Sequence, residues 1–106
     1  MAKKLYHKLV RDRIPEIIEQ SGKTCVVSTL SDKEYLRMID EKLTEELDEY
    51  YADGNIEELA DLIEVIYAAA KVRGYTIEQL EAVRVDKVKL RGAFDKRILL
   101  TEVIDE

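Results

Sequence analysis

Tryptophan is absent from this sequence of 106 residues, and cysteine, proline, histidine and phenylalanine each occur once. The single cysteine, Cys25, cannot form an intramolecular disulfide, a bond on which small secreted domains commonly depend. The longest apolar run, residues 65–70, is far shorter than the roughly 20 residues of a membrane span. The opening residues also lack the apolar stretch of a secretory signal. We therefore expect a cytoplasmic protein that does not enter a membrane.

Basic residues are also scarce relative to acidic ones. The sequence has 17 Lys and Arg against 23 Asp and Glu, which gives a formal net charge of -6. A protein that binds nucleic acid usually presents a basic face to the phosphate backbone, so we do not expect a nucleic-acid partner. The hydrophobic fraction of 46% nevertheless predicts a folded chain rather than a disordered tail.

No repeat, low-complexity tract or long linker divides the sequence, so we expect residues 1–106 to form a single domain. A domain of this size buries a modest core. Self-association is therefore expected, because a second copy of the chain can cover apolar surface that one copy leaves exposed.

The pattern of apolar residues and caps predicts a mainly all-α fold. A short helix is expected over residues 11–20, where Pro15 suits the first turn. Ser31 and Glu34 form a capping-box pattern before a long amphipathic helix that ends near residues 53–55, and Thr76 with Gln79 forms a second box.

Two further helices complete the prediction. One spans residues 56–73, begins after Asn55 and is apolar almost all round, so we expect it to be central and the most enclosed. The other spans residues 77–91. Because Asp53-Gly54-Asn55 is a tight turn, the first two long helices should form an antiparallel hairpin. Residues 24–29 and 97–103 are rich in β-branched and aliphatic residues, which favours a small two-stranded ribbon between them.

Acidic charge is concentrated in the predicted hairpin. Residues 31–64 contain 13 acidic and three basic residues, whereas the rest of the chain is net positive. Counted outward from the turn of an antiparallel hairpin, Glu46 faces Asp61 and Glu49 faces Glu58. Four carboxylates this close stay ionised only when cations compensate them. All-oxygen ligands suit Mg²⁺, with Mn²⁺ as a substitute, so these four residues are the predicted metal ligands.

The acidic segment allows other interpretations. A turn that differs by one residue would bring in Glu45 or Asp48, and Glu57 and Glu64 lie within one helical turn of Glu58 and Asp61. The acids could also form only a solvated face, since most charged helix positions are exposed. A di-iron centre or a zinc site would need more histidine or cysteine than the chain has, and the turn is too short for a calcium loop.

Several motifs resemble a known family. The carboxylate pattern Glu45-Glu46-x-x-Glu49 followed by Glu58-x-x-Asp61 resembles the MazG-like, all-α nucleoside triphosphate pyrophosphohydrolases. The opening Tyr6-His-Lys-Leu-Val-Arg-Asp-Arg-Ile-Pro and the later Arg91-Gly-Ala-Phe-Asp-Lys-Arg resemble a short branch called phosphoribosyl-ATP pyrophosphohydrolase-like. Together these segments extend over nearly the whole chain.

The resemblance implies a Mg²⁺-dependent enzyme that hydrolyses a nucleoside triphosphate between its α- and β-phosphates. Non-canonical or surplus nucleoside triphosphates are the expected substrates, and hydrolysis of phosphoribosyl-ATP is an alternative activity. A non-catalytic helical assembly protein is an alternative of a different class. The resemblance also implies that Glu46, Glu49, Glu58 and Asp61 bind the metal, with a nearby carboxylate such as Glu45 acting on the attacking water. A homodimer or homotetramer built around a four-helix core is implied as well.

A triphosphate has more negative charge than bound metal offsets, so cationic residues are needed beside it. The aromatic Phe94 could stack on a base, although packing would also explain it. These candidates for substrate binding lie toward the two ends of the chain: Lys8, Arg11, Arg13, Arg84, Lys87, Arg91, Phe94 and Lys96. The sequence does not specify the base, the sugar, the number of metals, the catalytic base or the size of the oligomer.

Overall fold

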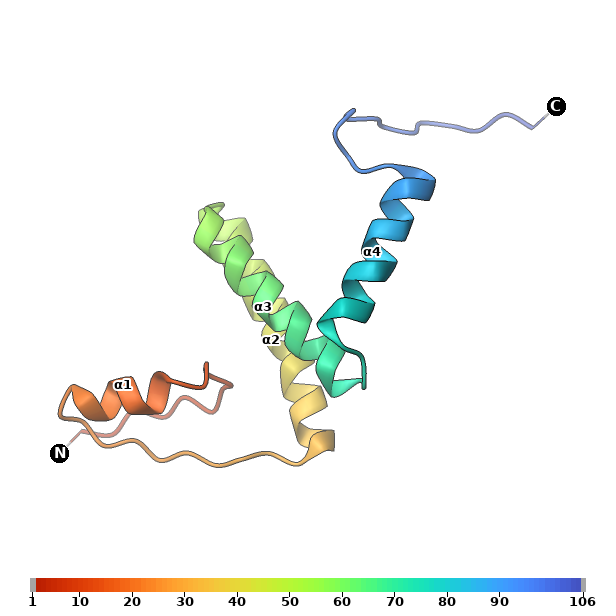
Figure 1. Cartoon of the computed structure of the whole chain (residues 1–106). Coiled ribbons are helices and arrows are strands. Elements are labelled where there is room, and N and C mark those ends of the chain that lie inside the picture. The colour runs from red at the N-terminus through yellow and green to blue at the C-terminus, as the bar shows by residue number, and fades with distance from the viewer. Residues whose placement is uncertain (1, 106) are drawn as a thin grey trace. The chain divides into compact units, whose positions relative to one another are not determined.

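The computed structural model describes residues 2–105, and the all-α prediction is confirmed. Its helices are α1 (Ile14–Gln20), α2 (Asp32–Asp53), α3 (Ile56–Val72) and α4 (Ile77–Arg91) (Figure 1). The chain divides into two compact units, residues 1–75 and 76–106, so a single folded domain stays a prediction. None of the helices found in residues 2–105 has the combination of length and apolar character that a membrane span requires.

Helices α2 and α3 form the expected antiparallel hairpin (Figure 1). The turn depends on Gly54, whose φ of 64° lies in the left-handed region that favours glycine. The Gly54 N–H donates to the carbonyl of Tyr50 at 2.7 Å and closes α2. Asn55 then begins α3, because its Oδ1 accepts a hydrogen bond from the Glu58 N–H at 3.0 Å.

The other helix starts follow the predicted signals to different extents. Thr76 and Gln79 form a complete capping box at α4, with reciprocal hydrogen bonds of 3.0 and 2.8 Å. At α2, Ser31 Oγ accepts from the Glu34 N–H at 3.3 Å but donates to the Glu34 carboxylate, so only half of the box forms. The short helix α1 begins at Ile14, three residues later than predicted, with Pro15 in its first turn.

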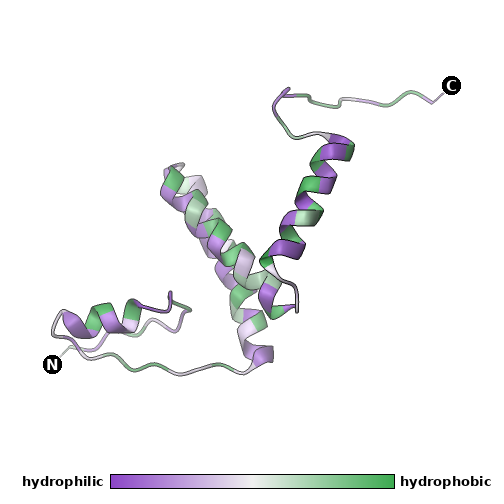
Figure 2. Cartoon of the chain, viewed as in Figure 1, coloured by the Kyte–Doolittle hydropathy of each residue, from purple (hydrophilic) through white to green (hydrophobic). Residues whose placement is uncertain are grey.

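The inner face of the hairpin is formed by the apolar stripe of α2, in which Ile39 is buried and 4% exposed. Near the end away from the turn, Arg73 Nη2 lies 3.3 Å from Asp40 Oδ2 and links α3 to α2. The prediction that α3 is enclosed is wrong for the single chain, since no residue of α3 is fully buried. Figure 2 shows many apolar residues along α3, which contacts α2, and Leu59, Ile63 and Ile66 of α3 are exposed.

The predicted ribbon is also wrong. Residues 24–29 and 97–103 contain no strand in the structure, and Val26 is 98% exposed. The segments have suitable residues, but β-propensity mainly reports packing on a sheet surface. An isolated pair of strands is marginal in water without a third strand or a covering helix. These segments are therefore extended chain, one between α1 and α2 and the other after α4.

Candidate metal centre

Carboxylates from both arms of the hairpin converge. Glu46 of α2 and Glu58 and Asp61 of α3 each offer an oxygen, and these three oxygens lie within 4.8 Å of one another. Glu58 and Asp61 share a face of α3 because they are three residues apart. The hairpin turn at Gly54 places that face opposite Glu46. The helix spacing and the turn together therefore build the cluster.

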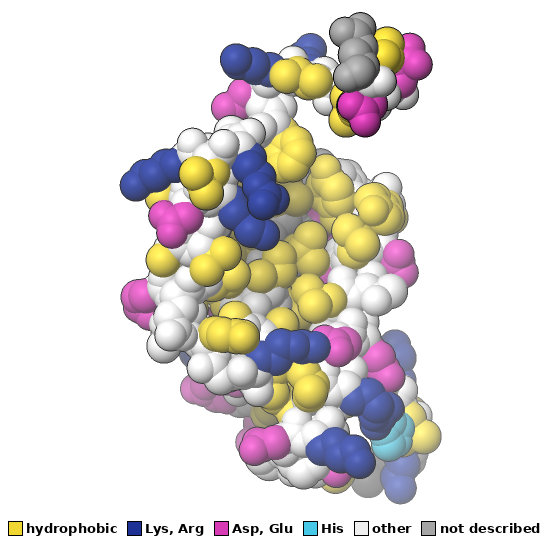
Figure 3. All heavy atoms as spheres, turned by 90° about the vertical axis from the view of Figure 1, so that its right-hand side faces the viewer, with side chains coloured by type: hydrophobic (Ala, Val, Ile, Leu, Met, Phe, Trp, Pro, Cys, Tyr) yellow, Lys and Arg dark blue, Asp and Glu magenta, His cyan; other side chains and the backbone are white. Residues whose placement is uncertain are grey.

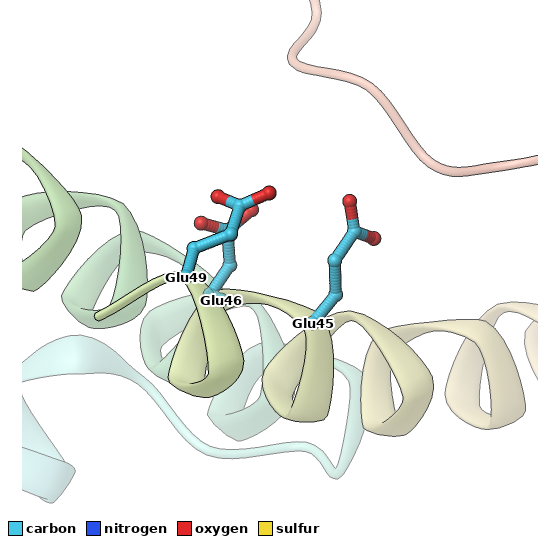
Figure 4. Close-up of side chains that lie close together, drawn as sticks. All are labelled: Glu45, Glu46 and Glu49. Carbon is cyan, nitrogen blue, oxygen red and sulfur yellow. The ribbon is translucent and has the colours of Figure 1, made fainter. Parts of the chain in front are cut away.

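A second group lies along α2 and shares Glu46 with the first. Oxygens of Glu45, Glu46 and Glu49 also lie within 4.8 Å of one another. Figure 4 shows these three side chains pointing to the same side of α2, with the carboxylates of Glu46 and Glu49 close together. The five residues of the two groups are called the carboxylate cluster below: Glu45, Glu46, Glu49, Glu58 and Asp61.

Burial separates this cluster from an ordinary acidic surface. Glu46 is 6% exposed, which is unusual for a charged residue. Two buried oxygens, Glu46 Oε2 and Glu58 Oε2, have no hydrogen-bond partner in the described chain. Buried carboxylate oxygens without partners are costly, and such oxygens are suited to receive a cation.

The pKa values of two cluster residues respond to this environment. Burial raises the pKa of Glu46 above its ordinary value, and the negative charge of Glu49 raises it further, against an opposing effect of Lys42. Loss of solvation likewise raises the pKa of Glu58, followed by repulsion from Asp53. The carboxylates of Glu46 and Glu58 therefore lie where neighbouring cations do not fully offset burial and repulsion.

Three cations lie against the cluster. Lys42 Nζ lies 3.3 Å from Glu45 and 3.4 Å from Glu46, and its side chain is only 17% exposed. Lys8 Nζ lies 3.6 Å from Glu45, and Arg11 Nη2 lies 2.5 Å from Asp61 Oδ1. Five carboxylates against three cations leave two negative charges when all are ionised, the charge that one Mg²⁺ would neutralise.

Lys42 was not among the site residues predicted from the sequence. The available signal was its spacing, since a lysine three and four residues before two glutamates lies on their helix face. The alternative acids Asp48, Glu57 and Glu64 are exposed and lie outside both carboxylate groups. Among the predicted cations of the first unit, Arg13 pairs with Glu16 of α1 at 3.2 Å instead of with the cluster.

The remaining predicted substrate residues belong to the unit of residues 76–106. Arg84, Lys87 and Arg91 line one side of a hollow of about 480 Å³ at the end of α4, and Phe94 also lines it. Phe94 is 97% exposed, so its ring is accessible. Arg84 Nη2 lies 2.8 Å from Glu81, and this hydrogen bond lowers the pKa of Glu81. Lys96 lies two residues beyond Phe94 in the chain.

The donor set of the cluster determines which ions fit. All five candidate ligands are carboxylates, without histidine or cysteine, so a hard divalent cation fits better than zinc or copper. Glu46 and Glu58 each have an unpartnered oxygen, which matches the need of such an ion for additional ligands. The residues present therefore fit Mg²⁺ or Mn²⁺.

Comparison with known proteins gives one informative similarity. No family model matches the chain, and no solved structure matches it. A stretch of 45 residues is 58% identical to a Mycolicibacterium smegmatis protein described as uncharacterized. This match covers 42% of the chain and 46% of the relative, so it spans less than half the length of that protein.

Proposed function

We propose that this protein is a Mg²⁺-dependent nucleotide pyrophosphohydrolase. The observation that supports the proposal is the convergence of Glu58 and Asp61 on the buried Glu46, with two carboxylate oxygens left unpartnered. The MazG-like motif residues coincide with this cluster. The reaction is attack of water on the α-phosphorus of a nucleoside triphosphate, with cleavage of the bond to the bridging oxygen and departure of pyrophosphate.

In the proposed mechanism, Glu46, Glu49, Glu58 and Asp61 would hold the metal. When bound, Mg²⁺ neutralises phosphate charge and increases the acidity of water. Glu45 lies within the cluster but is half-buried rather than buried, so it is suited to accept a hydrogen bond from the attacking water. Lys42 forms ion pairs with Glu45 and Glu46, and these pairs limit the movement of both carboxylates.

Cations outside the cluster would orient the substrate. Lys8 and Arg11 are the best placed, because they already lie at the carboxylates. In the other unit, Lys87, Arg91 and Phe94 line the hollow at the end of α4 and stay the predicted residues for binding a phosphate and a base. Non-canonical or surplus nucleoside triphosphates are the proposed substrates, and phosphoribosyl-ATP contains the same α,β-anhydride.

A second copy of the chain is the proposed partner. Helix α3 exposes Leu59, Ile63 and Ile66 at steps of four and three, which form one apolar stripe on its surface. Exposed stripes of this kind are usually covered in the assembled protein. We propose a homodimer or homotetramer in the cytoplasm, in which this stripe packs against another copy.

The test is a product assay. The purified protein is incubated with Mg²⁺ and a panel of ordinary, deoxy and damaged nucleoside triphosphates plus phosphoribosyl-ATP, and pyrophosphate is resolved from orthophosphate. We expect pyrophosphate release that Glu58→Gln lowers by at least about 100-fold, because it removes a metal ligand. Glu41→Gln is the matched control, since Glu41 is an exposed carboxylate of α2 paired with Arg37.

No turnover with any substrate, with Mg²⁺ or Mn²⁺, would contradict the proposal and favour the non-catalytic assembly protein. Turnover that Glu58→Gln leaves unchanged would contradict the site assignment. Turnover restricted to phosphoribosyl-ATP would replace the proposed substrate class but keep the chemistry.

A further inference from the structure

Two cations that lie on the carboxylate cluster come from outside the hairpin. Residues 2–13, called the N-terminal arm here, precede α1 and contribute Lys8 and Arg11. Figure 4 shows an extended part of the chain on the side of α2 toward which Glu45 points. Arg11 and Asp61 are 50 residues apart in sequence, so local helix geometry does not explain this contact.

The arm is held loosely compared with Lys42. The side chains of Lys8 and Arg11 are 46% and 57% exposed, whereas that of Lys42 is 17% exposed. Lys42 is also fixed on α2, while residues 2–10 contain no helix. Ion pairs between exposed groups are weak and exchange readily with other ions. The two arm cations can therefore leave the cluster at little cost, and Lys42 stays.

The position of Arg11 conflicts with that of a metal. Its Nη2 lies 2.5 Å from Oδ1 of Asp61, whose carboxylate belongs to the cluster. Mg²⁺ binds its oxygen ligands at about 2.1 Å and carries two positive charges. A guanidinium and a divalent cation at the same carboxylate repel each other, and they compete for its negative charge.

We propose that Lys8 and Arg11 are exchangeable counter-ions of the carboxylate cluster. In the metal-free protein they neutralise Glu45 and Asp61. When a divalent cation binds, both side chains leave the carboxylates and become available to the phosphates of the substrate. The same two cations thus act first on the cluster and then on the triphosphate, and this inference rests on the proposed function.

The experiment follows the arm by limited trypsin digestion of the intact protein. Trypsin cleaves after Lys8 and after Arg11, and it needs the basic side chain to be free. Digestion is carried out without added calcium, with and without Mg²⁺, and the fragments are quantified by mass spectrometry. Cleavage after Arg97, in the other unit, serves as the internal reference for protease activity.

We expect Mg²⁺ to accelerate cleavage after Lys8 and Arg11 about two- to fivefold relative to the reference, the range that breaking exposed ion pairs allows. Adding a triphosphate analogue with a methylene group between its α- and β-phosphorus atoms should restore protection. Glu58→Gln should abolish the Mg²⁺ effect, because it removes a metal ligand that neither arm cation contacts.

Calorimetric titration with Mg²⁺ alone separates the possible failures. If Mg²⁺ binds and Glu58→Gln weakens that binding, but cleavage of the arm does not change, the counter-ion inference is wrong and the metal site stands. If no Mg²⁺ binds with or without the analogue, both proposals fail. Arg11→Gln should bind Mg²⁺ alone more tightly and Mg²⁺ with the analogue less tightly, whereas Arg37→Gln, which removes an ion pair elsewhere on α2, should change neither.

Discussion

At the scale of single residues, Glu46 is the most unusual feature of the molecule. It is an ionisable side chain placed where solvent is largely excluded, beside Glu49 and with one unpartnered oxygen. Burial of a charge without full compensation lowers stability. Such a residue is favoured where the site has a role that a neutral residue cannot fill, and metal binding is the role we propose for Glu46.

The raised pKa of Glu46 gives a pH dependence. Between the ordinary value of 4.5 and the raised value, the folded protein binds more protons than the unfolded chain. The free energy of unfolding of the metal-free protein should therefore fall as pH rises through this range. Glu58 acts in the same direction, because its pKa is also raised. Urea denaturation at a series of pH values in the presence of a chelator measures the slope.

The same reasoning predicts that Glu46→Gln raises the free energy of unfolding of the metal-free protein at pH 7. The variant loses an ion pair with Lys42, but burial and repulsion outweigh that pair in setting the pKa. With added Mg²⁺ the wild-type protein should become more stable than Glu46→Gln, because Mg²⁺ stabilises only the protein that binds it. A variant that is more stable both with and without Mg²⁺ would indicate a cluster with no metal, as expected of the non-catalytic assembly protein.

At the scale of elements, the hairpin turn sets the site. Helices α2 and α3 place Glu46 opposite Asp61 only because α2 ends at Gly54 and α3 begins directly after Asn55. Asn55→Ala removes the side-chain acceptor of the Glu58 N–H and should lower the free energy of unfolding by about 1 kcal/mol. Asn55→Ser keeps a capping oxygen and is the control. Equal stability of the two variants in thermal or urea unfolding would show that the cap contributes little.

Much of this element-level structure could be predicted from sequence. The caps at Asn55 and Thr76 and the turn at Gly54 are local signals, and the structure contains all three. The convergence of Glu46 with Glu58 and Asp61 follows from the turn and the helix spacing. The ribbon prediction was wrong because strand formation depends on distant partners and covering surface, which residue propensity does not specify.

The contacts between cations and the carboxylate cluster also differ in how far the sequence predicts them. Lys42 could have been found from its spacing along α2, since its partners are on the same helix. The pairing of Arg11 with Asp61 depends on how the arm returns to α3, and sequence spacing contains no information on that path. Ion pairs within one helix could therefore be predicted from the sequence. For contacts between distant segments, the sequence indicated that cations are needed but not which carboxylate each one contacts.

At the scale of the whole molecule, the exposed apolar surface is the main feature. Figure 3 shows that many hydrophobic side chains are exposed at the surface. On α3, Ile63 is 48% exposed within its apolar stripe. A chain this small gains little stability from its own core, so covering that stripe with a second copy would stabilise both.

We predict that Ile63→Asp weakens self-association by at least about tenfold, since burying one isoleucine contributes roughly 1.5 to 3 kcal/mol. Sedimentation velocity over a range of protein concentrations measures the change. Val26→Asp is the control, because Val26 is almost fully exposed outside the helices. A monomeric wild-type protein at all concentrations, or equal effects of the two substitutions, would rule out the α3 stripe as the interface.

The most direct test of the central claim is to run the reaction in water labelled with oxygen-18 and to locate the label in the products. Hydrolysis supported by the carboxylate cluster should give nucleoside monophosphate that contains the label and pyrophosphate that does not, because water attacks the α-phosphorus. The reaction should depend on Mg²⁺ and be lost in Glu58→Gln. Label in pyrophosphate or orthophosphate, or no turnover at all, would contradict the account.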